Sequence, residues 1–104
     1  MPGIVVLTTA PDAKTARSLA KRLVADRSAA CVSIKDGFVS YYRWKGKLTK
    51  AGESLLLIKT EKSKFARVKQ TLLAEHPYEN PEIISLPVVQ GSQKYLSWLS
   101  DSVK

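Results

Sequence analysis

The sequence predicts an α+β fold in a single domain over residues 1–104, and three observations predict it. Residues 4–9 are a continuous apolar run rich in β-branched side chains, residues 16–24 and 65–72 repeat apolar side chains at helical spacing, and residues 38–44 alternate at strand spacing with aromatic side chains on both faces. The resulting order is strand, helix, strand, strand, helix, strand. This order is the split βαβ or ferredoxin-like arrangement, βαββαβ, here with an extended aromatic hairpin and a C-terminal helix.

The first strand and helix are predicted from a change of period near Pro11. The run at residues 4–9 indicates a strand that is covered on both faces and therefore central in its sheet. Pro11 and Asp12 form a helix-start signal, and one apolar helical face follows up to a predicted end near Arg27. The face consists of Ala16, Leu19, Ala20, Leu23 and Val24. We expect it to pack on the sheet.

The middle of the chain is predicted to form a hairpin with an aromatic outgoing strand. Residues 30–34 are a β-prone run, and the Asp-Gly pair at residues 36–37 is expected to break it with a turn. Residues 38–44 then continue as the aromatic strand, which ends at the Lys-Gly pair of residues 45–46.

The return strand is expected over residues 54–60, after a bulge or loop at the Ala-Gly pair of residues 51–52. A second apolar helical face begins at Phe65. It ends before Pro77, because the residue that precedes a proline avoids the helical region.

The last part of the chain is predicted to be a loop, a strand and a helix. Residues 78–81 form the loop and residues 82–86 the strand, and Pro87 argues that this strand lies at a sheet edge. A short C-terminal helix opens after residues 91–92. Its apolar positions are Leu96, Leu99 and Val103.

The aromatic hairpin has no predicted cover within its own chain. Two helices on one sheet face account for the apolar helical stripes but leave residues 38–44 exposed. A hairpin alone in water is marginally stable, and an apolar edge invites pairing with another chain. We therefore expect further copies of the chain to cover this segment.

The charge balance leaves two interpretations open. The chain has 17 Lys and Arg against nine Asp and Glu, a formal net charge of +8. Lys14, Arg17 and Lys21 recur opposite the first apolar stripe, as expected of a solvated helix face, but the same excess would attract a polyanion. Residues 4–9 and 55–60 contain no aromatic side chain on which an RNA base could stack, so we expect no specific nucleic-acid binding.

Three features predict a cytoplasmic protein. No apolar run approaches the ~20 residues that cross a bilayer, so no membrane role is expected. The single cysteine, Cys31, cannot close an intrachain disulfide, which fits a reducing compartment. The N-terminus enters the apolar run at residues 4–7 without the features of a secretory signal.

Several linked motifs make the chain similar to the CutA family over essentially its full length. They are Leu7-Thr8-Thr9-Ala10-Pro11-Asp12, Ala29-Ala30-Cys31-Val32, Tyr42-Arg43-Trp44-Lys45-Gly46-Lys47, Leu57-Ile58-Lys59-Thr60, His76-Pro77-Tyr78-Glu79-Asn80-Pro81-Glu82-Ile83 and Tyr95-Leu96-Ser97-Trp98-Leu99. The resemblance implies a ferredoxin-like homotrimer whose sheets pair across subunits. It also implies binding of copper or another divalent cation and a role in metal tolerance.

The resemblance suggests Glu75 and His76 as metal ligands. Some members of the family hold copper through a first-strand cysteine and two adjacent histidines, and the matching positions here are Thr8, Glu75 and His76. Because a threonine replaces the thiolate, we expect a weaker site that is less selective for soft copper. The alternative for His76 is a helix-end histidine that hydrogen-bonds locally.

Six further residues are expected at an inter-subunit cleft or interface: Cys31, Tyr42, Trp44, Lys59, Tyr78 and Glu82. Lys59 and Glu82 are charges at predicted strand positions, where they would form either the polar floor of a cleft or a structural ion pair. The three aromatic residues are expected to pack between subunits. Cys31 is also compatible with a small, unreactive core residue.

The sequence favours a binding protein over an enzyme. It contains no glycine-rich phosphate loop at the first strand-helix junction, no G-x-S-x-G motif and only one histidine. We therefore expect a non-catalytic trimer that binds a divalent cation. The alternative is a trimeric scaffold or signalling protein that receives a small ligand or a partner protein in clefts between subunits.

Overall fold

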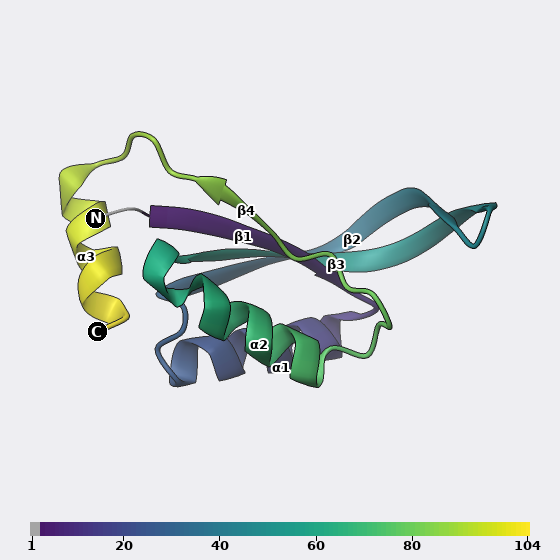
Figure 1. The fold of residues 1–104 in the computed structure, drawn as a ribbon, viewed down its shortest axis with the longest axis horizontal. Coiled ribbons are helices and arrows are strands. Elements are labelled where there is room, and N and C mark those ends of the chain that lie inside the picture. Colours follow the sequence, from purple (N-terminus) through teal and green to yellow (C-terminus); the bar gives the residue numbers. More distant parts are fainter. Residues whose placement is uncertain (1–2) are drawn as a thin grey trace.

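The computed structural model describes residues 3–104, which form one antiparallel sheet of four strands with three α-helices (Figure 1). The strands are β1 (Gly3–Ala10), β2 (Cys31–Trp44), β3 (Lys47–Glu61) and β4 (Ile84–Pro87), in the spatial order β2-β3-β1-β4. The predicted βαββαβ order is confirmed, with β1 inside the sheet and β4 at its edge.

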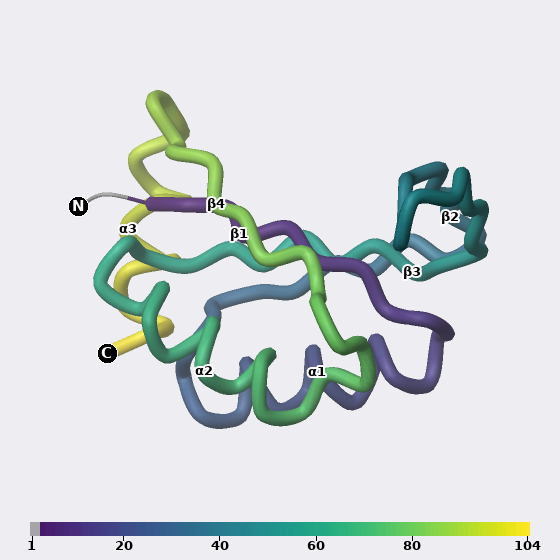
Figure 2. Tube along the Cα trace, turned by 45° about the vertical axis from the view of Figure 1, so that its right-hand side comes forward, coloured from purple at the N-terminus to yellow at the C-terminus, as the bar shows by residue number. Residues whose placement is uncertain are grey.

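The helices explain the apolar stripes of the sequence. Figures 1 and 2 show α1 (Ala13–Ala25) and α2 (Phe65–Glu75) on the same face of the sheet, and α3 (Gln93–Ser102) at one end of the molecule. A 3₁₀ turn, η1 (Lys62–Lys64), leads into α2. Asp12 caps α1, because its carboxylate accepts a hydrogen bond of 2.7 Å from the backbone N–H of Thr15. The core between helices and sheet includes Val6, Leu19, Leu23, Leu56, Ile58, Val68 and Leu72.

A two-stranded arm projects beyond the sheet because its strands differ in length from β1. Residues 54–61 of β3 pair with β1, whereas residues 47–53 pair with β2 alone. At the tip, Lys45 and Gly46 both have positive φ angles, 51° and 80°, as in the two-residue hairpin turns that match strand twist. The arm extends the molecule to 44 Å along its longest axis (Figures 1 and 2).

The strand boundaries differ from the prediction at three places. The Asp-Gly pair at residues 36–37 does not end the strand, because β2 continues through it and shifts register between Lys35 and Phe38 as a β-bulge. The Ala-Gly pair at residues 51–52 lies in regular ladder within β3. The last strand begins at Ile84, so Glu82 lies in the preceding loop and not on a strand.

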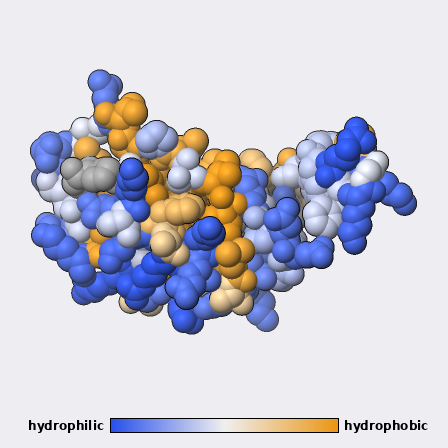
Figure 3. Space-filling view, viewed as in Figure 1, coloured by the Kyte–Doolittle hydropathy of each residue, from blue (hydrophilic) through white to orange (hydrophobic). Residues whose placement is uncertain are grey.

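An apolar patch lies on the face of the sheet opposite α1 and α2, beside the polar side chains of Ser33 and Lys59. Val5 is paired with Leu86 and Leu7 with Ile84, so these four side chains share that face. Leu86 and Ile84 are 50% and 49% exposed. Figure 3 shows hydrophobic side chains gathered over the middle of the molecule, between mostly hydrophilic ends.

In the same part of the chain, residues 3–104, no helix combines the length and the apolar character needed to cross a bilayer. Lys14, Arg17 and Lys21 are exposed on α1, as predicted. The predicted apolar face is wrong at Val24, which lies in the last turn of α1 and is 44% exposed.

The bulge generates a testable prediction. Gly37 has a φ of +73°, a region that L side chains adopt at a cost, so Gly37→Ala is expected to lower the free energy of unfolding by about 1 kcal/mol. Gly52→Ala is the matched control, because it faces open space on the opposite strand without a positive φ. Urea unfolding of both variants at one protein concentration measures the difference. Equal stability of the two variants would contradict the bulge geometry.

Candidate functional site

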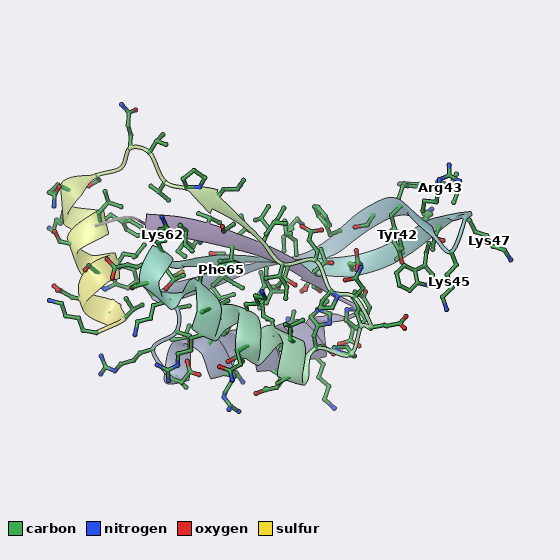
Figure 4. All side chains as sticks on the ribbon, viewed as in Figure 1. Tyr42, Arg43, Lys45, Lys47, Lys62 and Phe65 are labelled. Atoms are coloured by element: carbon green, nitrogen blue, oxygen red, sulfur yellow. The ribbon has the colours of Figure 1, made fainter. Side chains whose placement is uncertain are left out.

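A pocket of about 750 Å³ lies where the arm leaves the sheet. Its lining includes Thr9 of β1, Tyr42 and Trp44 of β2, Glu53 of β3, and Tyr78 and Glu82 of the loop that follows α2. The register explains how the arm contributes to it, because Ser40, Tyr42 and Trp44 alternate onto one face. Figure 4 shows Tyr42 and Arg43 leaving the arm on opposite sides. Four of the six residues predicted at a cleft therefore meet at one place.

Glu53 is the most buried charged group of the pocket, at 8% exposure. The Tyr78 hydroxyl donates a hydrogen bond of 2.6 Å to its Oε2 atom. Burial raises the pKa of Glu53, but the hydroxyls of Ser40, Tyr78 and Thr9 outweigh burial and hold that pKa below its ordinary value. Burial together with Glu53 raises the pKa of Tyr78, which keeps the phenol protonated as a donor. The pocket thus contains an ionised carboxylate at neutral pH.

The prediction from sequence missed Glu53. No local sequence signal indicated it, because its position as the last residue before β3 pairs with β1 is set by the strand register, which only the structure shows. Its burial depends on Tyr78, which is 25 residues away along the chain.

His76 links the end of α2 to the central strand. The backbone N–H of Tyr78 donates to Nδ1 (3.1 Å), so Nδ1 is the acceptor nitrogen and Nε2 carries the proton. Nε2 then donates to the carbonyl oxygen of Thr9 at 2.6 Å. With 8% exposure, this imidazole fixes the loop that carries Tyr78 against β1.

The other predicted ligand, Glu75, points to a different partner. Its carboxylate forms a salt bridge of 3.0 Å with Arg22 of α1. Both nitrogens of His76 take part in hydrogen bonds, and no group of three His, Cys, Asp or Glu side chains within residues 3–104 is arranged to hold a metal ion. Within residues 3–104 of one chain the structure therefore shows no preformed metal site, and metal binding at Glu75 and His76 stays a prediction.

Cys31 and Lys59 form a separate cluster away from the pocket. They are register partners on β2 and β3, and the Lys59 ammonium lies 3.9 Å from the Cys31 sulfur and donates a hydrogen bond to Ser33. Cys31 is partly exposed. Within the described residues, Lys59 is not brought to Glu82, so a floor shared by these two charges would require a second chain.

Comparison with known proteins identifies the family. The family model for the CutA1 divalent ion tolerance protein matches residues 4–102. The chain belongs to this family. The divalent-cation tolerance protein CutA of Thermus thermophilus is 46% identical over 98 residues, which are 94% of this chain and 95% of that protein. The chloroplastic protein CutA of Arabidopsis thaliana is 41% identical over 104 residues, and this chain spans 57% of its length.

Solved CutA structures have the same fold. CutA1 from Oryza sativa matches with a TM-score of 0.97 and 39% identity, over 100% of this chain and 95% of that chain. The periplasmic divalent cation tolerance protein CutA from Archaeoglobus fulgidus matches with a TM-score of 0.95 and 34% identity, over 98% of this chain and 99% of that chain. The predicted CutA resemblance is confirmed.

The expected cytoplasmic location is wrong as a conclusion from this sequence. CutA relatives are described as chloroplastic and as periplasmic. The physical reason is that a CutA domain is held by an apolar core and backbone hydrogen bonds, which are stable in reducing and oxidising compartments alike. The free thiol of Cys31 therefore carries no information about the compartment.

The contact between Tyr78 and Glu53 predicts a pH-dependent loss of stability. Tyr78→Phe removes a hydrogen bond to a buried carboxylate, so it should lower the free energy of unfolding by about 1–2 kcal/mol at pH 7. A lowered pKa stabilises the fold above the ordinary value near 4.5, and this contribution disappears as pH falls through the folded-state pKa. The difference between wild type and Tyr78→Phe should therefore shrink below about pH 4.5.

Urea unfolding between pH 7 and pH 3, at one protein concentration, measures this effect. Tyr95→Phe is the control, because Tyr95 lies on α3, packs against Trp98 in a tilted arrangement and does not line the pocket. A loss for Tyr78→Phe that stays constant over this pH range would contradict the coupling to Glu53.

Proposed function

We propose that the chain acts as a divalent-cation tolerance protein. It binds a divalent cation without catalysing a reaction, and it works as a homotrimer. The observation that carries the proposal is the match to the CutA1 divalent ion tolerance family over residues 4–102. The comparisons do not favour the alternative of a scaffold or signalling protein.

The pocket supports a binding role rather than catalysis. General base catalysis by histidine needs a free ring nitrogen, and both nitrogens of His76 are engaged with backbone groups. Glu53 is ionised and accepts a hydrogen bond from the Tyr78 hydroxyl. The raised pKa of Tyr78 keeps its phenol protonated, so Tyr78 does not act as a base near neutral pH. Their hydrogen bond keeps Glu53 ionised and Tyr78 neutral, and such fixed charge states suit recognition of a ligand.

The uncovered surfaces of the single chain support the homotrimer. The open sheet face presents Ile84 and Leu86, and the arm presents Val39, Tyr42 and Trp44, each at least two-fifths exposed. An edge strand beside an apolar face favours pairing with another copy. Association would bury the arm side chains that residues 3–104 of the same chain leave exposed.

The homotrimer predicts a mass in solution of about 34.5 kDa, three times the 11.5 kDa of one chain. Leu86→Lys places an ammonium group on the open sheet face and is expected to lower that mass, because burying an unpaired charge is unfavourable. Val89→Lys is the control, since Val89 is 86% exposed outside the strands. Light scattering on all three proteins is the measurement, and a wild-type mass of one chain would refute the assembly.

Copper binding at Glu75 and His76 is the finer part of the proposal. The hydrogen bonds of His76 mean that a metal must displace the Tyr78 N–H from Nδ1, and Glu75 must release Arg22. Because of these competing contacts, and because residue 8 is a threonine and not a thiolate ligand, we expect the site to bind a divalent cation weakly. The cation is then cargo and not a resident cofactor.

A calorimetric titration with copper(II) tests these ligands. A site at Glu75 and His76 predicts that the binding heat falls in His76→Ala and in Glu75→Gln. Glu61→Gln, at the end of β3, should leave the heat unchanged. Circular dichroism verifies that each variant is folded, and the Glu75 variant keeps the test valid if His76→Ala unfolds. Equal heats in wild type and both variants would remove copper from this position.

A further inference from the structure

The outer face of α1 carries positive charge and no negative side chain. The 13 residues of this helix include four basic side chains and no Asp or Glu. Lys14, Arg17 and Lys21 are exposed and follow one another at three and four residues, so they form one stripe along the helix. Among residues 3–104, no salt bridge includes Lys14 or Lys21. Arg17 pairs with Asp36 at 3.5 Å, and both of these side chains are more than half exposed.

This distribution of charge lowers the stability of the helix. Like charges three or four residues apart repel one another, and a cation in the first turn opposes the helix dipole. Lys14 lies in that turn, and the carboxylate of Asp12 before it already accepts the capping hydrogen bond of Thr15. A face that served solubility alone would mix positive and negative side chains at this spacing and gain stability. The uniform charge therefore indicates a negatively charged partner that relieves the repulsion.

The stripe lies apart from the surfaces that favour association of copies. α1 and α2 cover one face of the sheet, and the apolar patch that includes Ile84 and Leu86 lies on the opposite face (Figure 1). The arm projects beyond the end of the sheet (Figure 1). Association through the patch and the arm does not use the outer face of α1, and a single chain exposes that face as well. Access to the stripe therefore depends neither on the proposed homotrimer nor on metal binding.

The side chains of α1 favour one kind of polyanion. The helix contains no aromatic residue on which an unpaired base could stack, which argues against a single-stranded nucleic acid. Of the described side chains of α1, only Val24 is large, apolar and exposed, so the helix lacks the apolar face that enters a membrane surface. Lys14 and Lys21 lie about 10 Å apart along the helix axis, a length that faces about three phosphates of one strand in a duplex. The phosphate backbone of a nucleic-acid duplex fits these features.

We propose that the outer face of α1 binds the sugar-phosphate backbone of a nucleic-acid duplex without reading its bases. Lys14, Arg17 and Lys21 donate hydrogen bonds from their ammonium and guanidinium groups to phosphate oxygens. This function goes beyond cation tolerance, because the ligand is a polyanion and the surface does not include Glu75 or His76. It requires no base contact, which agrees with the expectation that the chain binds no specific nucleic acid.

The test is fluorescence anisotropy of a short labelled DNA duplex titrated with the protein in its own assembly state. Three phosphate contacts predict that the wild-type affinity falls about fortyfold between about 50 and 200 mM sodium chloride. Lys14→Gln/Lys21→Gln should bind at least about tenfold more weakly at the lower salt and lose only about threefold over the same range. Lys62→Gln/Lys94→Gln is the matched control, because it removes the same charge from exposed side chains outside α1 and should stay within about threefold of wild type.

The other outcomes overturn the proposal. They are absence of duplex binding by wild type, equal salt dependence of wild type and the α1 variant, equal losses in the α1 variant and the control, and tighter binding of a single strand of the same length. Binding to vesicles of phosphatidylserine and phosphatidylcholine without binding to the duplex would assign the stripe to a membrane surface instead. Urea unfolding at one protein concentration excludes a structural role, since removal of like charges should not lower the midpoint of the α1 variant. A lower midpoint together with weaker binding would also contradict the proposal.

Discussion

The mismatch in length between β1 and β3 governs the shape of this molecule. β1 has eight residues and β3 has 15, so β3 is paired on both sides only within its C-terminal half, at residues 55–59. The seven residues that extend beyond β1 would span about 24 Å as a strand. They pair with β2 alone and form the arm. The arm and the pocket at its junction with the sheet both follow from this overhang.

The junction of arm and sheet places a charge inside the fold. Glu53 is the last residue of β3 before the ladder with β1 begins, and the loop after α2 covers it with Tyr78. His76 holds that loop to the carbonyl oxygen of Thr9, so the end of a helix and two strands are connected through one imidazole. A buried carboxylate that is held by hydroxyl groups remains ionised, which gives a basic protein one acidic pocket.

The two roles proposed for this family member, assembly and ligand binding, use overlapping surfaces. Association of copies uses edges and apolar faces, which are large and need no particular chemistry. Ligand binding uses the few polar groups of the pocket, where geometry and charge select the partner. The arm belongs to both, since its aromatic side chains supply apolar area as well as pocket lining.

Local patterns predicted most of the fold. The periodic apolar positions around Leu19 and Leu23 and the cap at Asp12 depend on neighbours in sequence, and the structure confirms the helix that they predict. Boundaries were less predictable. The Asp-Gly pair at residues 36–37 favours a turn locally, but the ladder between β2 and β3 continues past it, and Asp36 accepts a hydrogen bond from Ser54 on the opposite strand. Pairing over the whole hairpin outweighs the local preference.

The sequence by itself determined the element order, the edge position of the last strand and the membership in a family, because each depends on local periodicity or on motifs in a fixed order. Only the tertiary structure decided which charges meet. Glu53 and Tyr78 are 25 residues apart, and Thr9 and His76 are 67 residues apart. Packing of α2 and its following loop against the sheet brings them together, and nothing in the local sequence specifies those distances.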